Sequence, residues 1–196
     1  MTQQIIIDPI TRIEGHSKIT IQLDENGRVE DARFHVTQYR GFEKFIEGRP
    51  YYEMPGLMGR ICGICTISHE MASAKACDQI MAVRIPETAR KLRRIVNLAS
   101  ILQSHALSFF YLSSPDFLLG PGAAPSVRNV MGLAQAMPEL TAQVVKWRQA
   151  GQMMIEKFAG KAIHPVAMVP GGFAKPMRES ERREMLAQCR EQLEFA

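Results

Sequence analysis

Two cysteines separated by two residues are the part of this sequence best suited to chemistry. Cys62 and Cys65 lie in the run RICGICTISH, residues 60–69. Such a pair brings two sulfurs close enough to share one soft metal ion or to form a disulfide, and Gly63 is expected to let the backbone turn between them. These residues alone leave three interpretations open: metal ligation, redox dithiol chemistry, or two buried thiols.

The remaining cysteines bear on that choice. Cys77 and Cys189 stand singly, whereas a structural zinc site usually has a second close pair. A thioredoxin-type dithiol would follow a strand in a βαβ unit, and no such unit can be recognised here. Both observations favour ligation of a different metal over zinc or dithiol chemistry.

The first forty residues are expected to form an antiparallel sheet. Residues 5–7 are a short β-branched run that ends at Asp8-Pro9, because proline removes a backbone donor. Residues 18–23 and 28–36 flank Asn26-Gly27, and this dipeptide supplies the positive φ angles that a tight hairpin needs.

From Gly41 onward the hydrophobic spacing changes to three and four, which predicts helices. Short helices are expected over 41–47 and 68–83, and residues 113–126, rich in proline and glycine, are expected to form an ordered loop. Three longer helices are predicted from their apolar stripes: Leu92, Val96, Ala99, Leu102, Ala106 and Phe109; Leu140, Val144, Trp147, Gly151, Met154 and Phe158; and Arg182, Leu186, Cys189 and Leu193.

The predicted fold class is therefore α+β. A small antiparallel sheet, residues 1–40, precedes a bundle of long helices, residues 41–196, which carries the cysteine pair. We expect the two parts to form one continuous domain. The chain stops without a polar tail, which predicts that this domain is cut at its C-terminus.

Composition argues against several classes of protein. The net charge of +4 comes from dispersed residues, and the densest basic cluster, Arg90, Lys91, Arg93 and Arg94, reads as one helical face, so no nucleic acid partner is expected. No signal peptide is recognised, and no membrane span is expected, because a span needs ~20 consecutive apolar residues. The four cysteines fit a reducing, cytoplasmic setting.

Three motifs together resemble nickel-iron hydrogenase large subunits, in their N-terminal part. They are Arg-x-Cys-Gly-x-Cys-x-x-x-His at 60–69, DPITRIEGH at 8–16 and RGFE at 40–43. Residues 103–120 and 169–172 look most like the cytoplasmic, NAD-linked bidirectional branch of that family, although a relative that reduces a deazaflavin shares the cysteine signature.

The resemblance implies a role for each residue of the cysteine motif. In that family two such pairs give four thiolates to nickel, and two of these also bridge to an iron that carries cyanide and carbon monoxide. Cys62 would be a terminal nickel ligand and Cys65 a nickel-iron bridge. His69 would donate a hydrogen bond to a sulfur; its alternative is an ordinary surface or core histidine. Cys77 and Cys189 do not match the second pair.

Two acids acquire roles in the same way. Glu14 matches the glutamate that relays the proton released when hydrogen is split, and Glu43 matches a residue that helps to hold magnesium. The alternatives are a Glu14 paired with Arg12 or His16, and an exposed Glu43 paired with a lysine. His105 and the methionines around Met153 are expected to pack rather than to bind metal.

The implied function is reversible oxidation of molecular hydrogen, with electrons passed to an iron-sulfur small subunit. The chain has no Gly-x-Gly-x-x-Gly motif, so NAD is expected on separate diaphorase subunits. The competing hypothesis is a non-catalytic, truncated interaction module without a metal centre. Because no second cysteine pair is present, the chain alone is expected to be inactive.

Overall fold

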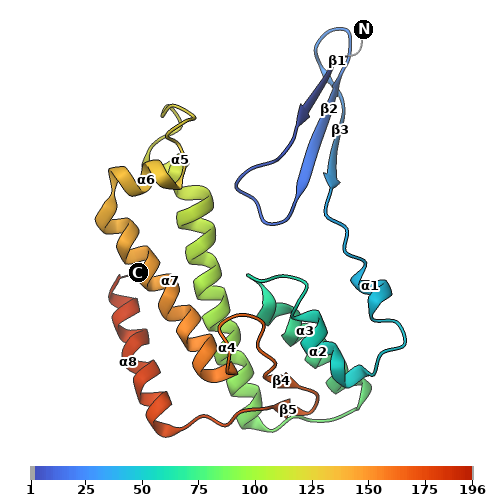
Figure 1. The fold of residues 1–196 in the computed structure, drawn as a ribbon, viewed down its shortest axis with the longest axis vertical. Helices are drawn as coiled ribbons and strands as arrows, with labels where there is room; N and C mark the ends of the chain where they lie inside the picture. The colour runs from blue at the N-terminus through green and yellow to red at the C-terminus, as the bar shows by residue number, and fades with distance from the viewer. Residues whose placement is uncertain (1–2, 196) are drawn as a thin grey trace. The chain divides into compact units, whose positions relative to one another are not determined.

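The computed structural model describes residues 3–195 and divides the chain into two compact units, Met1–Phe45 and Ile46–Ala196. The first unit holds a small three-stranded antiparallel sheet and one short helix, and the second holds the longer helices (Figure 1). This confirms the α+β fold class. Whether the two units form one continuous domain stays a prediction, and each is described separately below.

The sheet of the first unit has the strand order β1-β2-β3. Its strands are β1 (Gln3–Ile7), β2 (Ser17–Leu23) and β3 (Val29–Val36), followed by the short helix α1 (Phe42–Phe45). The predicted hairpin between β2 and β3 is confirmed. Asp24 Oδ1 accepts hydrogen bonds from the backbone N–H groups of Asn26 and Arg28, both at 2.8 Å, and Gly27 has a φ of 76°.

The second unit is mainly helical. Its elements are the 3-10 turn η1 (Tyr51–Glu53), α2 (Met54–Met58), α3 (Thr66–Ile80), α4 (Glu87–Ala106), the π-helical segment η2 (Leu107–Ser113), α5 (Ser114–Leu118), α6 (Val130–Ala136), α7 (Pro138–Ala159), β4 (Met168–Val169), β5 (Gly172–Phe173) and α8 (Glu179–Phe195). Helices α4 and α7 lie side by side, and β4 and β5 pair as an antiparallel hairpin (Figure 1).

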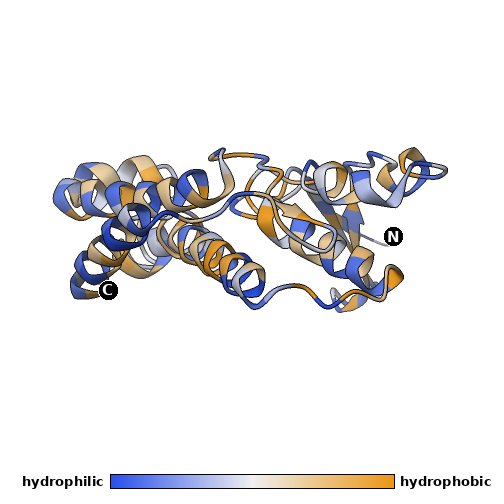
Figure 2. Ribbon diagram, turned by 90° about the horizontal axis from the view of Figure 1, so that it is seen from below, coloured by the Kyte–Doolittle hydropathy of each residue, from blue (hydrophilic) through white to orange (hydrophobic). Residues whose placement is uncertain are grey.

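The core of this unit lies where α3, α4 and α7 meet. Its buried side chains include Ile67 and Ala74 of α3, Leu92, Val96 and Ala99 of α4, and Met154, Ile155 and Phe158 of α7. Figure 2 shows that these helices carry hydrophobic residues over only part of their circumference. A side chain at Gly151 would come within 3.0 Å of the Gln103 Cβ atom, so glycine permits the close approach of α7 to α4.

The stripe predicted for α4 is confirmed at Val96 and Ala106 but fails at its end. Phe109 is 49% exposed, and Gln103 takes a buried position beside a half-buried Leu102. Phe109 lies within the π-helical segment η2, whose wider turn departs from the α-helical register. The predicted loop over 113–126 also needs correction, because α5 occupies its first part.

The helix predicted from the third stripe is confirmed as α8, but this stripe is not the face that packs. The inward face of this helix carries Met185, 4% exposed, with Gln188 and Gln192 half-buried. Leu186 and Leu193 are instead 44% and 77% exposed. Periodicity located an apolar stripe on α8, but it gave no information on which side of the helix meets α7.

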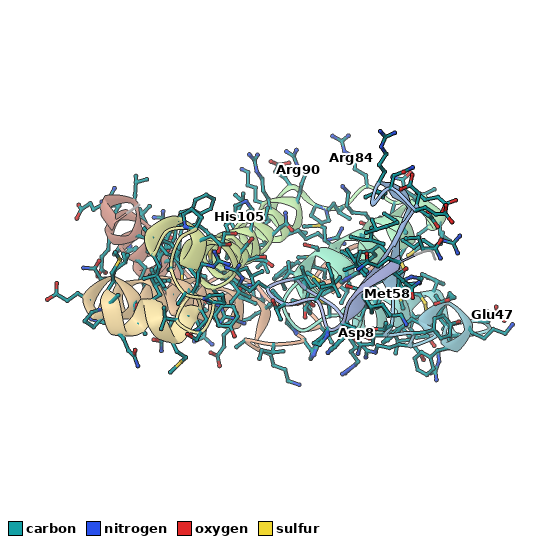
Figure 3. All side chains as sticks on the ribbon, turned by 90° about the horizontal axis from the view of Figure 1, so that it is seen from above. Asp8, Glu47, Met58, Arg84, Arg90 and His105 are labelled. Carbon is teal, nitrogen blue, oxygen red and sulfur yellow. The ribbon has the colours of Figure 1, made fainter. Side chains whose placement is uncertain are left out.

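Two expectations about α4 also change. The helical run Glu87–Leu118 is long and apolar enough to cross a membrane by length and composition, contrary to expectation. A core helix has the same composition, and α4 packs in the core described above. The basic cluster is not one exposed face either: Arg90 extends outward, as does the nearby Arg84 (Figure 3), whereas Arg93 is 2% exposed.

Candidate metal centre

Cys62 and Cys65 lie in one turn at the start of α3. Both side chains are half-buried, and the Cys65 backbone N–H donates to the Cys62 sulfur at 3.3 Å. The carbonyl of Cys65 accepts from the N–H groups of Ser68 and His69, which begins the helix.

The conformational role expected for Gly63 is wrong. Its φ does not lie in the left-handed region, and a Cβ atom built on it would have no neighbour within 4 Å. The turn between the cysteines therefore does not require glycine conformationally. The space that a Cβ atom would take at Gly63 is open.

Neighbouring elements hold this turn, called here the cysteine loop (residues 59–66). The Thr66 hydroxyl donates to the carbonyl of Cys62 at 2.6 Å. From α4, the Gln103 side-chain amide donates to the carbonyl of Ile64 at 3.1 Å. Two carbonyl groups of the loop are thus fixed by these hydrogen bonds.

His164 also touches the loop, from the segment between α7 and β4. Its Nδ1 lies 2.9 Å from the Gly59 carbonyl oxygen and 3.3 Å from the Thr66 hydroxyl oxygen. Sequence reasoning missed this residue. A single histidine before Pro165 in a loop carries no periodic signal that could have revealed it.

Glu70 is a second residue that the sequence reasoning missed. It is fully buried on α3, and its Oε1 accepts from the N–H groups of Ala167 and Met168 at 2.6 and 2.8 Å. Burial raises the pKa of the Glu70 carboxyl, against the lowering effect of these hydrogen bonds and of Arg93. The spacing of Glu70 from Ile67 and Ala74 was an available signal, since it puts the acid on the buried face.

A buried ion pair lies at the far end of α3. Arg93 Nη1 is 2.5 Å from Asp78 Oδ2, and Arg93 also donates to the carbonyls of Val169 and Gly172. The N–H of Gly171 donates to Asp78 Oδ1 at 2.7 Å. Burial raises the pKa of Asp78, but the Arg93 guanidinium and the Gly171 N–H outweigh it, and the pKa is lowered. This network anchors the β4–β5 hairpin to α3 and α4.

The other sulfurs and the nearby histidine are distinct from the pair. Cys77 is buried, donates to the Tyr51 carbonyl at 3.2 Å, and has a pKa raised by burial. Cys189 is exposed on α8. His69 is half-buried one turn after Cys65, and its hydrogen bond to a sulfur stays a prediction.

The donor set fits part of a soft-metal site. Two thiolates suit nickel and low-valent iron. Within residues 3–195, however, no third histidine, cysteine or acid joins them in a metal-binding group. The described residues therefore supply two of the four thiolates that the resemblance implies.

The predicted acids belong to the first unit. Glu14 is exposed and lines a cavity of about 130 Å³ with Phe34 and with His16, whose Nδ1 donates to Gln38 Oε1 at 2.9 Å. Glu43 raises the pKa of the Tyr39 hydroxyl by hydrogen bonding to it. Both predicted roles, proton relay and magnesium ligand, stay predictions.

Comparison with known families agrees with the motifs. Residues 4–39 match the HoxL-like family, and residues 40–123, which include the cysteine loop, match the nickel-dependent hydrogenase family. The two matches meet between Tyr39 and Arg40.

Individual relatives match nearly the whole chain. A vhu-type F420-non-reducing hydrogenase subunit of Methanocaldococcus jannaschii is 47% identical over 193 residues, 98% of this chain and 46% of the relative. The beta subunit of the NAD-reducing hydrogenase HoxS of Cupriavidus necator is 43% identical over 192 residues, 95% of this chain and 39% of the relative. The chain thus spans less than half the length of these curated relatives.

Solved structures give the same result. A crystal structure of an NAD+-reducing nickel-iron hydrogenase in the hydrogen-reduced state has a TM-score of 0.91 at 49% identity, covering 97% of this chain and 43% of that one. A nickel-iron-selenium hydrogenase from Desulfovibrio vulgaris Hildenborough has a TM-score of 0.84 at 32% identity, covering 100% and 42%. By motif, sequence and fold, this chain belongs to the family of nickel-iron hydrogenase large subunits.

Proposed function

We propose that this chain forms part of the catalytic subunit of a hydrogenase and supplies Cys62 and Cys65 to a nickel-iron centre. Cys62 would hold the nickel, and Cys65 would hold both metals of a centre whose iron would also carry cyanide and carbon monoxide. When bound, such a centre supplies the redox-active metal at which molecular hydrogen is reversibly oxidised.

The observation that carries this proposal is the shared turn of the two sulfurs. The Cys65 N–H donates to the Cys62 sulfur, and both side chains are half-buried at the start of α3. This geometry supports a pair of thiolates that face one metal. Hydrogen bonds to the carbonyls of Cys62 and Ile64 also help to keep the pair in place.

The other residues have supporting roles in this proposal. His69 donates a hydrogen bond to a ligand sulfur, which stabilises its charge. Glu14 accepts the proton released when hydrogen is split and passes it outward. Glu43 provides a hard carboxylate for magnesium.

Electrons leave to an iron-sulfur small subunit, and NAD is reduced on diaphorase subunits of a cytoplasmic complex. The matched relative named NAD-reducing hydrogenase and the matched NAD+-reducing structure support this branch. A different electron acceptor is the second candidate, because the F420-non-reducing hydrogenase relative is 47% identical, against 43% for the NAD-reducing one.

Nickel binding tests the role of the pair. The purified chain is titrated with Ni²⁺ under anaerobic conditions, and thiolate-to-nickel charge-transfer absorption is recorded. We expect Cys62→Ser and Cys65→Ser each to abolish the band, since a neutral hydroxyl does not replace a soft thiolate. Cys189→Ser, at an exposed cysteine on α8, is the matched control and should leave the band intact.

The same titration separates the two hypotheses of function. A module that serves only for interaction would give no band with the unaltered chain, or a band insensitive to Cys62→Ser. Either result would refute the assignment of the pair as metal ligands.

A further inference from the structure

We propose that His164 is a positioning residue for the cysteine pair: its ring ties the two ends of the cysteine loop together. The inference rests on the proposed function, in which Cys62 and Cys65 act on one metal. It adds a residue from a segment far along the chain, between α7 and β4, to the two cysteines that bind.

One donor atom serves both ends of the loop. A carbonyl oxygen can only accept, so the His164 Nδ1 at 2.9 Å from the Gly59 oxygen must carry a proton. The Thr66 hydroxyl gives its own proton to the Cys62 carbonyl, so its oxygen accepts from the same Nδ1 at 3.3 Å. The ring therefore closes the loop at residue 59, before the cysteines, and at residue 66, after them.

The backbone at His164 is held in an unusual conformation. Its φ is 51°, in the left-handed region that residues other than glycine rarely adopt. Such a conformation persists only where its surroundings enforce it, and it is common at functional sites. Here the surroundings include the fully buried Pro165 that follows it.

Glu70 fixes the same segment a few residues later. Its buried carboxyl accepts from the N–H groups of Ala167 and Met168. Thr66 and Glu70 both belong to α3, so one helix holds the His164 ring at its first turn and the following backbone at its second. The ring thus has a fixed direction from which to clamp the loop.

The role assigned to His164 is indirect, because the ring reaches the loop through Gly59 and Thr66. Loss of the ring should therefore change how well two sulfurs act together while leaving the reactivity of a distant thiol unchanged. A merely structural residue would alter both or neither. This difference decides the choice of probe.

Phenylarsine oxide is a suitable probe, since its arsenic binds two thiols at once. Two arsenic–sulfur bonds form, the two thiol protons leave with the arsenic-bound oxygen as water, and no electrons are transferred. The dissociation constant is measured on the full 196-residue chain by calorimetry. Alkylation of Cys189 by iodoacetamide, recorded in parallel, reports on a single exposed thiol.

His164→Gly removes the ring and is compatible with the left-handed backbone. We expect phenylarsine oxide to bind about 10- to 100-fold more weakly, the usual effect of losing a group that orients metal ligands. Ile163→Gly, at the exposed neighbouring position, is the matched control and should bind as the unaltered chain does. Alkylation of Cys189 should be the same in all three.

An isosteric pair of variants covers the case in which the glycine variant does not fold. Asparagine and aspartate both tolerate the left-handed region. The amide N–H of His164→Asn can donate to the Gly59 carbonyl, whereas the carboxylate of His164→Asp cannot. We expect His164→Asn to restore tight binding and His164→Asp to lose it.

Each remaining outcome counts against the inference in a different way. Unchanged binding in His164→Gly, or equal binding in the asparagine and aspartate variants, would overturn the role of His164 and leave the metal role of the cysteines standing. Equal weakening in Ile163→Gly would assign the effect to chain flexibility. If the unaltered chain captures no arsenical through Cys62 and Cys65, the proposed function fails together with the inference.

Discussion

Arg93 of α4 and Asp78 of α3 form a buried ion pair whose atoms Nη1 and Oδ2 lie 2.5 Å apart, with side chains 3% and 9% exposed. Neither charge is satisfied by its partner alone. Arg93 also donates to two carbonyls of the β4–β5 hairpin, and Asp78 accepts from the N–H of Gly171. The pair therefore joins two helices and a hairpin that follows the segment of His164.

Removing one member of this pair should be costly. Asp78→Ala leaves the Arg93 guanidinium buried without its counter-charge, and we expect the free energy of unfolding to fall by about 3–5 kcal/mol. Urea denaturation followed by circular dichroism measures this. The exposed pair of Glu87 and Arg90 is the control: Glu87→Ala should have a much smaller effect, and equal losses would contradict the account.

Stability should depend on pH through Glu70. Its pKa in the folded chain is raised by burial above the ordinary 4.5, so the folded state binds its proton more tightly than the unfolded state does. The stabilising effect of the protonated carboxyl is full below pH 4.5 and is lost as the pH rises through the raised pKa. Glu70→Gln imitates the protonated form and should not lose it.

Urea denaturation of both chains at a series of pH values tests this. The stability of Glu70→Gln relative to the unaltered chain should rise with pH above 4.5 and then level off. Glu156→Gln, at an exposed acid on α7, should show no such trend. Parallel curves for the unaltered chain and Glu70→Gln would refute the assignment.

The chain as given should evolve no hydrogen from a reduced dye. Residues 3–195 bring together two thiolates, Cys62 and Cys65, and no third metal-binding side chain with them. A nickel ion held by two sulfurs is open to solvent and lacks the remaining donors of the proposed centre. Gas chromatography of the purified, nickel-loaded chain measures this, and robust hydrogen evolution would contradict it.

Glu14 is tested in a hydrogenase complex that contains this sequence. Glu14→Gln keeps the size and hydrogen bonding of the side chain but removes its titrating proton. We expect nickel content and the infrared bands of the iron ligands to be unchanged while turnover falls by roughly two orders of magnitude or more. Glu30→Gln, at an exposed acid on β3, is the control. Normal turnover in Glu14→Gln would remove it from the proton path.

The local parts of the fold were predictable because their causes lie in neighbouring residues. Asn26-Gly27 marked the hairpin, and the spacing of Val96, Ala99 and Ala106 marked the buried face of α4. The exposure of Phe109 was not predictable in this way, since it depends on a π-helical segment within a continuous helix. The buried face of α8 was missed because it is set by tertiary packing against α7, which the spacing of residues within α8 does not reveal.

In the candidate site too, residues with local causes were predictable and residues with long-range partners were not. Cys62 and Cys65 were found from their spacing, since both belong to one turn. His164 contacts that turn across about a hundred residues of chain, and no local pattern links the two. The spacing of Glu70 could have placed it on the buried face of α3, but its partners Ala167 and Met168 lie about a hundred residues away. Arg93 was assigned to an exposed basic face because sequence spacing alone does not show that Asp78 lies opposite it.

Because the space that a Cβ atom would take at Gly63 is open, a substitution there tests whether a bound group occupies that space. The φ of Gly63 is not in the left-handed region, and no atom beyond the adjoining Cys62 and Ile64 stands within 4 Å of the place that a Cβ atom would take, so the rest of the described chain leaves room for Gly63→Ala. Any loss of assembly or turnover caused by this methyl group in a hydrogenase complex must therefore come from a clash with something the chain binds. The effect of the added methyl group would then show whether the bound group lies close to the backbone between the two cysteines.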